Sequence, residues 1–309
     1  MSKPTLPSKL YKYRAFNVNT LSMITELEVF YADPKTFNDP FDCDLKFAFD
    51  RNHPVDEVEM IWNMIMSAHR SEKLVHRANR NHMYMATEHG GHYQDNGEGT
   101  QIYRDLLLRD IESQLREDLG SRGVLSMASK WDCPLMWSHY ADEHRGLCIE
   151  YATKDHRCDR LGPVDYNASR NISLEDIVNW KLHGSVAART KIVDAYFFAK
   201  QRQWKYEKEW RDIRQSEGMY PQPFKRITAI HFGYRCPKPV VAAVMGVLDH
   251  HGDAIKYYGM NTTTDGFGLN RRSMSQLVQD EELYYEPRTE SIAFIFDRLD
   301  PYTDEELFR

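Results

Sequence analysis

The chain has 309 residues, 41% of them hydrophobic and 28% charged, with a formal net charge of −6 at pH 7. This composition supplies a sizeable core, which excludes a disordered chain, and its mild acidity excludes a protein whose main role is to coat nucleic acid. The five cysteines are scattered without a CxxC pair and no apolar segment is as long as a membrane span, so we expect a cytoplasmic protein with free thiols and no membrane contact.

The N-terminal segment predicts two strands with a helix between them. "KLYKYRAF" alternates and is rich in aromatic residues, as is typical of a first strand, and "VFYAD" predicts a second strand. Between them, the residues from Thr20 to Glu28 are expected to form a short helix with Asn19 as its N-cap.

A loop, "FNDPFD", follows the second strand from Phe37 to Asp42. Asn38 and Asp39 are candidate substrate-binding residues there, although Asn-Asp-Pro is also ordinary turn chemistry. Asp39, with the segment Asp44 to Lys46, weakly matches the carboxylate-plus-lysine layout of Mg²⁺-dependent nucleases. Because such short matches arise often by chance, we assign no metal ligand.

Residues 55–120 have a different character from the segments around them. Two stretches with helical periodicity flank a polar loop, "TEHGGHYQDNGEGT". His82, His89 and His92 cluster around this loop, but their spacing fits no zinc-binding pattern. We interpret residues 55–120 as a helical insertion within a single α+β domain that covers residues 1–309.

Strands and helices continue through the rest of the chain. "WDCPLMWSHYADEHRG" predicts a helix from its cap at Asp132 to Gly146, and Ser173 with Asp176 forms a capping box for another. Further helices are expected in "ARTKIVDAYFFAKQRQW" and "KPVVAAVMGVLDHH", and strands in "GVLSMAS", "LCIEY", "ITAIHFGYR" and "AIKYYG". This order predicts an α+β fold with a mixed sheet.

The segment "KQRQWKYEKEWRDIR" contains the strongest candidate site. Read as a strand from Tyr206, it places Glu207, Glu209 and Arg211 on one face of the sheet. Two carboxylates beside a guanidinium are costly to bury unless they bind something. The alternative is a solvated edge strand whose glutamates form ordinary ion pairs.

Two further motifs are candidates for ligand contact. Arg14 lies on the first strand and has the side chain best suited to a bidentate grip on phosphate, although a strand arginine is more often a salt-bridge partner. Trp137 and Tyr140 are three residues apart on the predicted helix, with His144 one turn further. These side chains either pack in the hydrophobic core along one face of the helix or form a surface on which a planar ligand ring stacks.

Taken together, four motifs resemble a bacterial family called domain of unknown function 2971. They are "LYKYR", "FYADPKTFNDPFD", "MWSHYADEHRGLCIEY" and "WKYEKEWR", in this order. The resemblance extends from Leu10 to about Phe232, and the family name implies no activity.

The chain also has a weaker resemblance to ADP-ribosyltransferases, which share a split mixed β-sheet core. Arg14 on an early strand, the following helix, the segment from Ser126 to Tyr140 and the late Glu207-x-Glu209 match their order. The last pair is similar to the Glu-x-Glu of the arginine-type branch, and "CPLMWSHY" to a segment of the branch that modifies DNA. The chain departs from the family in having "LSMAS" where Ser-Thr-Ser is expected.

This second resemblance implies a site for NAD as co-substrate. Glu209 would stabilise the cationic sugar as nicotinamide leaves, and Glu207 would position the attacking group. The resemblance implies NAD contacts from Arg14, Tyr13, Ser126, Trp137, Tyr140 and Arg211, and acceptor contacts from Asn38, Asp39 and His139.

Three functions therefore remain open. The first is an NAD-dependent ADP-ribosyltransferase, a toxin or phage-defence effector, acting on a nucleic acid or protein and bound by an antitoxin or regulatory protein. The second is a metal-dependent nuclease, in which Asp39, Asp42 or Asp44 converges with Lys46. The third is a non-catalytic module that recognises nucleotides or nucleic acids with its aromatic residues.

Overall fold

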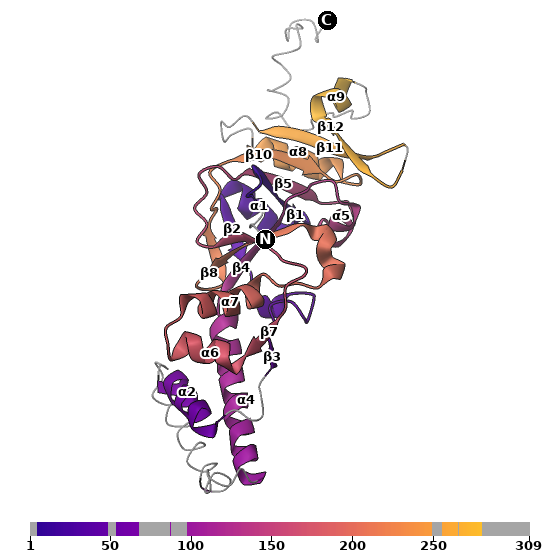
Figure 1. Ribbon diagram of the computed structural model, residues 1–309. Coiled ribbons are helices and arrows are strands. Elements are labelled where there is room, and N and C mark those ends of the chain that lie inside the picture. The colour runs from indigo at the N-terminus through magenta and orange to yellow at the C-terminus, as the bar shows by residue number, and fades with distance from the viewer. Residues whose placement is uncertain are drawn as a thin grey trace, which may run out of the picture. The chain divides into compact units, whose positions relative to one another are not determined.

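The computed structural model describes residues 5–48, 54–67, 87, 98–248, 255–264 and 266–279, and the chain divides into two compact units (Figure 1). The described part of the first unit comprises residues 30–48, 54–67, 87, 98–126 and 158–220, and that of the second comprises residues 5–29, 127–157, 221–248, 255–264 and 266–279. The predicted α+β class is confirmed, because helices and a mixed sheet make up the fold. The expected single domain stays a prediction.

Some sequence predictions lie outside the described residues. They concern His82 and most of the polar loop of the insertion, including His89 and His92, whereas the last three residues of that loop, 98–100, begin the helix Glu98–Gly120. Within the part that is described, no helix is long and apolar enough to cross a membrane. All five cysteines are described and all are free thiols, as expected.

The second unit is built on a mixed sheet. Its strands are β1 (Lys9–Arg14), β5 (Leu147–Ala152), β10 (Ile227–Phe232), β11 (Lys256–Thr262) and β12 (Leu269–Ser273), and its helices are α1 (Val18–Thr25), α5 (Pro134–Tyr140), α8 (Lys238–Leu248) and α9 (Met274–Gln279). The strand order is β12-β11-β10-β5-β1, and among these described strands β10 and β11 pair in parallel while the other neighbours are antiparallel. Strand β5 is central and buried, which explains its nearly continuous apolar sequence.

Helix α1 begins two residues earlier than expected. Its N-cap is Asn17 and not Asn19, because the Asn17 side chain accepts hydrogen bonds from both the backbone N–H and the hydroxyl of Thr20. The helix ends at Thr25, and Leu27 follows with a left-handed φ of 53°.

Helix α5 is much shorter than the predicted helix from Asp132 to Gly146. It begins after Cys133, whose side chain makes no capping hydrogen bond, and ends at Tyr140. Three consecutive residues, Asp142 to His144, then have positive φ, a conformation that costs non-glycine residues roughly 1–2 kcal/mol each and cannot continue a right-handed helix. Gly146 is required for a different reason, since a Cβ atom there would lie 2.2 Å from the carbonyl oxygen of Arg14.

The first unit combines short strands with a helical layer. At least half of each of its strands lies within the unit; the strands are β2 (Glu28–Tyr31), β3 (Lys46–Ala48), β4 (Gly123–Ala128), β6 (Leu161–Pro163), β7 (Asn171–Ser173), β8 (Glu209–Arg214) and β9 (Gly218–Pro221). Its helices are α2 (Val55–Ser67), α4 (Glu98–Gly120), α6 (Leu174–Lys181), α7 (Val186–Phe197) and the 3₁₀ turns η1 (Pro34–Thr36) and η2 (Arg202–Glu207). Strands β4, β8 and β6 follow one another in that order, while β3 pairs in parallel with β7.

The helices of the first unit share one apolar core. Helices α2 and α4 lie side by side, and α6 contacts α2 (Figure 1). Trp62, Tyr103, Ile172 and Ile177 are fully buried in this core. The capping box of α6 is confirmed, since Ser173 and Asp176 each accept a hydrogen bond from the other's backbone N–H.

Candidate functional site

The charged segment is a strand only from Glu209 onward, and the predicted start at Tyr206 is wrong. Residues 202–207 form the turn η2, and Lys208 follows it in the left-handed region with a φ of 48°. This backbone breaks the expected alternation before β8 begins. Glu207 therefore lies on the turn, while Glu209 and Arg211 share one face of the strand.

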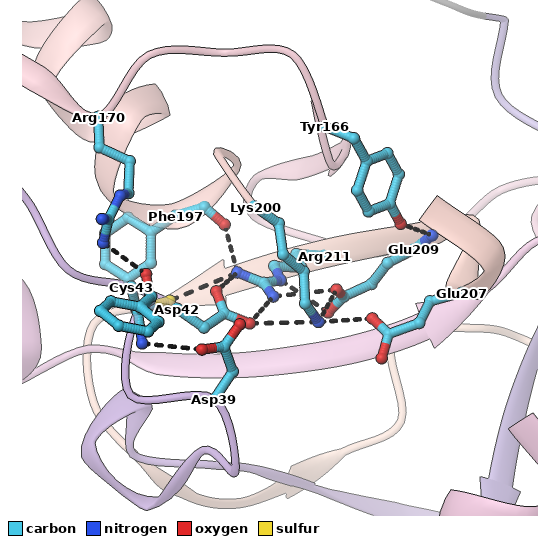
Figure 2. Close-up of polar contacts among 11 residues, drawn as sticks. Asp39, Asp42, Cys43, Tyr166, Arg170, Phe197, Lys200, Glu207, Glu209 and Arg211 are labelled. Atoms are coloured by element: carbon cyan, nitrogen blue, oxygen red, sulfur yellow. Dashed lines mark hydrogen bonds and ion pairs between the residues drawn. The ribbon is translucent and has the colours of Figure 1, made fainter. Parts of the chain in front are cut away.

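Arg211 joins two carboxylates in the interior of the first unit. Its Nε and one terminal nitrogen donate to the two carboxylate oxygens of Glu209, at 2.7 and 2.9 Å. Both terminal nitrogens donate to Asp42, at 2.8 and 2.6 Å, so Arg211 makes a two-bond contact with each acid (Figure 2). The Arg211 side chain is completely buried, and it also donates to the carbonyl of Phe197 at 2.8 Å.

Lys200 completes a charged cluster that we define as Asp42, Lys200, Glu207, Glu209 and Arg211. Its ammonium nitrogen lies 2.5 Å from Glu207, 2.9 Å from Glu209 and 3.2 Å from Asp42. Each of these side chains is at most 6% exposed. With all five groups ionised, three carboxylates face two cations, and the buried charged cluster keeps one net negative charge.

Glu209 is held in place from several directions. The Tyr166 hydroxyl accepts a hydrogen bond from the Glu209 backbone N–H at 2.8 Å. Burial raises the pKa of the Glu209 carboxyl, but the charges of Arg211 and Lys200, with hydrogen bonds from Arg211 and Ser126, outweigh it and hold that pKa well below its usual range. The carboxylate is therefore ionised at neutral pH. Ser126 lies on β4, so two strands distant in sequence meet at this acid.

This depressed pKa predicts a loss of stability in acid. The folded pKa of Glu209 lies below the unfolded value of about 4.3, so its stabilisation is complete above that pH and is lost as the pH falls further. We expect Glu209→Gln to be less stable than the parent at pH 7, and this difference to shrink steadily below pH ~4. Urea unfolding of both proteins between pH 7 and pH ~3 measures it. A difference that does not change with pH would contradict the assignment.

Other predicted NAD-binding residues belong to the second unit. Tyr13 and Trp137 meet edge to face with ring centroids 5.2 Å apart, and the Trp137 indole N–H donates to the carbonyl of Trp131. Arg14 is partly buried, and its Nε has no hydrogen-bond partner. The convergence of Arg14 with Glu207 and Glu209 stays a prediction.

His139 and Tyr140 end helix α5. Their rings meet edge to face with centroids 6.3 Å apart, and His139 is exposed. The sequence predicted that His144 continues the helix, but it lies in the turn that follows. Its ring still stacks on Trp137. The roles of His139 and Tyr140 in ligand binding stay predictions.

The "FNDPFD" loop contributes to the charged cluster through its last residue. Asn38 is exposed, whereas Asp39 is buried and accepts a hydrogen bond from the Phe41 backbone N–H at 2.9 Å, which is ordinary turn chemistry. The second carboxylate oxygen of Asp39 is buried and has no hydrogen-bond partner. Asp42, which follows in the loop, is bound by Arg211.

Two of the three acids expected in a metal-dependent nuclease, Asp42 and Asp44, are engaged by cations. Asp42 pairs with Arg211 and Lys200, and Asp44 pairs with Arg116 and with Arg170. Among the residues that the structure describes, no group of three or more His, Cys, Asp or Glu side chains is placed to hold a metal ion.

Sequence reasoning missed the role of three residues in this site. The sequence predicts Asp42 only as an acid of a nuclease, and it assigns Lys200 and Tyr166 no role in this site. Asp42 lies 169 residues before its partner Arg211, so no local spacing connects them. The sequence indicated this contact only indirectly, because the motifs "FYADPKTFNDPFD" and "WKYEKEWR" both contain acidic and basic residues and both belong to the resemblance to family 2971.

Comparison with known proteins supports that resemblance in part. A family model described as "Protein of unknown function (DUF2971)" matches residues 136–211, a segment that includes Trp137, Lys200, Glu207, Glu209 and Arg211. No curated protein and no solved structure matches the chain. The predicted resemblance to this family is thus confirmed over residues 136–211.

Proposed function

We propose that the chain is an NAD-dependent ADP-ribosyltransferase with Glu209 as its central carboxylate. The observation that supports this best is the contact between Ser126 and Glu209. Ser126 was assigned to the site from the order of motifs, and Glu209 from that order and from its place beside Glu207 and Arg211; the two residues belong to strands β4 and β8. Ser126 on β4 forms a hydrogen bond with the Glu209 side chain on β8, and such a contact helps to hold a catalytic carboxylate in one orientation.

The charge of the cluster suits the chemistry of this reaction. When the bond between the ribose and the nicotinamide nitrogen breaks, its electron pair leaves with the nicotinamide and positive charge develops on the sugar. An ionised, buried Glu209 within a net negative cluster stabilises that charge more strongly than a carboxylate in water. Arg211 and Lys200 keep Glu209 ionised and fixed in orientation before the substrate arrives.

Glu207 is proposed to position the attacking group of the acceptor. It sits on the turn that precedes β8, and its carboxylate shares the Lys200 ammonium with Glu209. The acceptor nucleophile forms a bond to the ribose carbon and loses its proton in the same reaction. We propose a nucleic acid or a protein as acceptor, a role in toxicity or phage defence, and an antitoxin or regulatory protein as partner.

The test uses NAD labelled on its adenylate phosphate. The protein is incubated with separate DNA, RNA and cell-protein fractions, while transfer of label and release of nicotinamide are both measured. We expect one fraction to become labelled, and Glu209→Gln to lower the rate on the order of 10²-fold or more, because the variant keeps the shape of the side chain and loses its charge.

A matched control separates this effect from a general loss of carboxylates. Glu143→Gln makes the same chemical change at a side chain that is 68% exposed, and it is expected to leave the rate unchanged. Thermal unfolding verifies that Glu209→Gln is folded at the assay temperature. If neither label transfer nor nicotinamide release occurs while a known ADP-ribosylating toxin is active in the same assay, the proposal is wrong.

A further inference from the structure

A serine and a histidine of the second unit, Ser138 and His144, form a pair that shares no residue with the charged cluster. The Ser138 hydroxyl oxygen lies 3.1 Å from Nε2 of His144. Ser138 is on the exposed side of α5, and His144 is half-buried. A nucleophile and a base within hydrogen-bond reach are the minimum for covalent catalysis by serine.

The backbone holds His144 in a costly conformation. Its φ of 70° follows two other residues with positive φ, Asp142 and Glu143. Such conformations persist where the surroundings enforce them, and they are frequent at functional sites. Here the His144 backbone N–H donates to the Trp137 carbonyl at 3.2 Å, and its carbonyl accepts from the Arg235 backbone N–H at 2.9 Å.

Gly233, two residues before Arg235, packs closely against the turn that contains His144. A Cβ atom at Gly233 would lie 2.1 Å from the His144 carbonyl oxygen, so only glycine allows this approach. The imidazole ring itself stacks on Trp137, with an angle of 14° between the ring planes. The orientation of His144 toward Ser138 is therefore fixed by packing and backbone bonds together.

The charge state of His144 suits a general base. Burial and the positive charge of Arg235 both lower the pKa of His144, so the ring is neutral at pH 7. A neutral ring with its proton on Nδ1 offers Nε2 as an acceptor for the Ser138 proton. The same hydroxyl also lies 3.0 Å from the carbonyl of Pro134, its alternative acceptor.

The surroundings of Ser138 indicate the class of substrate. Leu135 lies one helical turn earlier on α5 and is 48% exposed, so apolar surface adjoins the hydroxyl. Arg235 contributes a positive charge near His144, and such a charge favours a developing oxyanion. An apolar acyl group on an ester matches both features.

We propose that Ser138 is the nucleophile, and His144 the general base, of a site that hydrolyses acyl esters. The serine oxygen attacks the ester carbonyl carbon while its proton passes to Nε2 of His144. The bond to the alcohol breaks, and the alcohol leaves with that proton. Water then attacks the acyl-serine and gives a proton to His144, the carboxylic acid is released, and Ser138 recovers its proton.

An alkyl fluorophosphonate tests the nucleophile directly, because a serine bond to phosphorus forms as fluoride leaves. The labelled residue is located by digestion and mass spectrometry. Ser121 is an internal control, since it is also exposed and donates to a backbone carbonyl at 3.0 Å. We expect Ser138 to be labelled faster than Ser121 on the order of 10²-fold in the unaltered protein.

Two variants complete the test. His144→Asn, which tolerates positive φ, is expected to slow the labelling of Ser138 on the order of 10²-fold. Ser138→Ala is expected to abolish the protein's hydrolysis of p-nitrophenyl butyrate. Equal labelling of Ser138 and Ser121 overturns the proposal without any substitution, and unchanged labelling in a folded His144→Asn variant overturns the role of the histidine.

Discussion

Replacing Arg211 with methionine is expected to lower the free energy of unfolding by about 3–5 kcal/mol at pH 7. The guanidinium is fully buried and makes two-bond contacts with both Asp42 and Glu209. Methionine fills much of the volume but leaves these two carboxylates in the interior, where they share the single ammonium of Lys200 with Glu207. The cost thus arises from uncompensated buried charge and not from a cavity. Urea unfolding followed by far-ultraviolet circular dichroism measures it.

Two comparisons test this reason. Arg145→Met removes the same group from a surface pair with Glu143, where the arginine is 47% exposed, and should cost less than about 1 kcal/mol. Adding Asp42→Asn and Glu209→Gln to Arg211→Met removes the stranded charges and should restore part of the lost stability. A cost for Arg211→Met as small as that of Arg145→Met would contradict the account.

The sequence predicted the acidic centre of this site but not its geometry. Glu207, Glu209 and Arg211 were recognised because a strand from Tyr206 would place two carboxylates and a guanidinium on one face, where they are costly to bury unless they bind something. The start of the strand was wrong, because nothing in "YEKEW" reveals that Lys208 adopts a left-handed backbone. Even so, Glu207 and Glu209 both contact the ammonium group of Lys200. The two glutamates therefore lie close together, as predicted, although only Glu209 is on the strand.

The missing partners could not be found from local pattern. The contact of Arg211 with Asp42 depends on how the loop before β3 is placed against β8, which spacing alone does not encode. The same limit applies to α5, which the pattern extended to Gly146. One of the two backbone bonds that hold His144 comes from Arg235, about ninety residues later, and it helps to stabilise a conformation that local preference disfavours.

In the helical insertion, too, the sequence predicted a helix and its apolar face but not the elements that cover that face. Val58, Ile61, Trp62 and Ile65 recur at the spacing of one helix face, and all four are buried, so the periodicity correctly predicted α2 and its apolar side. Periodicity does not say what covers that side. In the structure it faces α4 and α6, within the same core as Ile172 and Phe197.

Trp62→Ala is therefore expected to destabilise the first unit by about 3–5 kcal/mol. The indole is fully buried, and its N–H donates to Asp110 on α4 at 3.1 Å, so the change opens a large cavity and removes a bond between the helices.

Met60→Ala is the matched control, since Met60 lies on the same helix but is 55% exposed; it should change the stability by less than about 0.5 kcal/mol. If α2 belongs to the core, as its contacts indicate, Trp62→Ala lowers the midpoint of the main urea transition. A separate early transition with an unchanged main midpoint would instead mean that the insertion unfolds independently, and that its contacts with α6 contribute little to the stability of the unit.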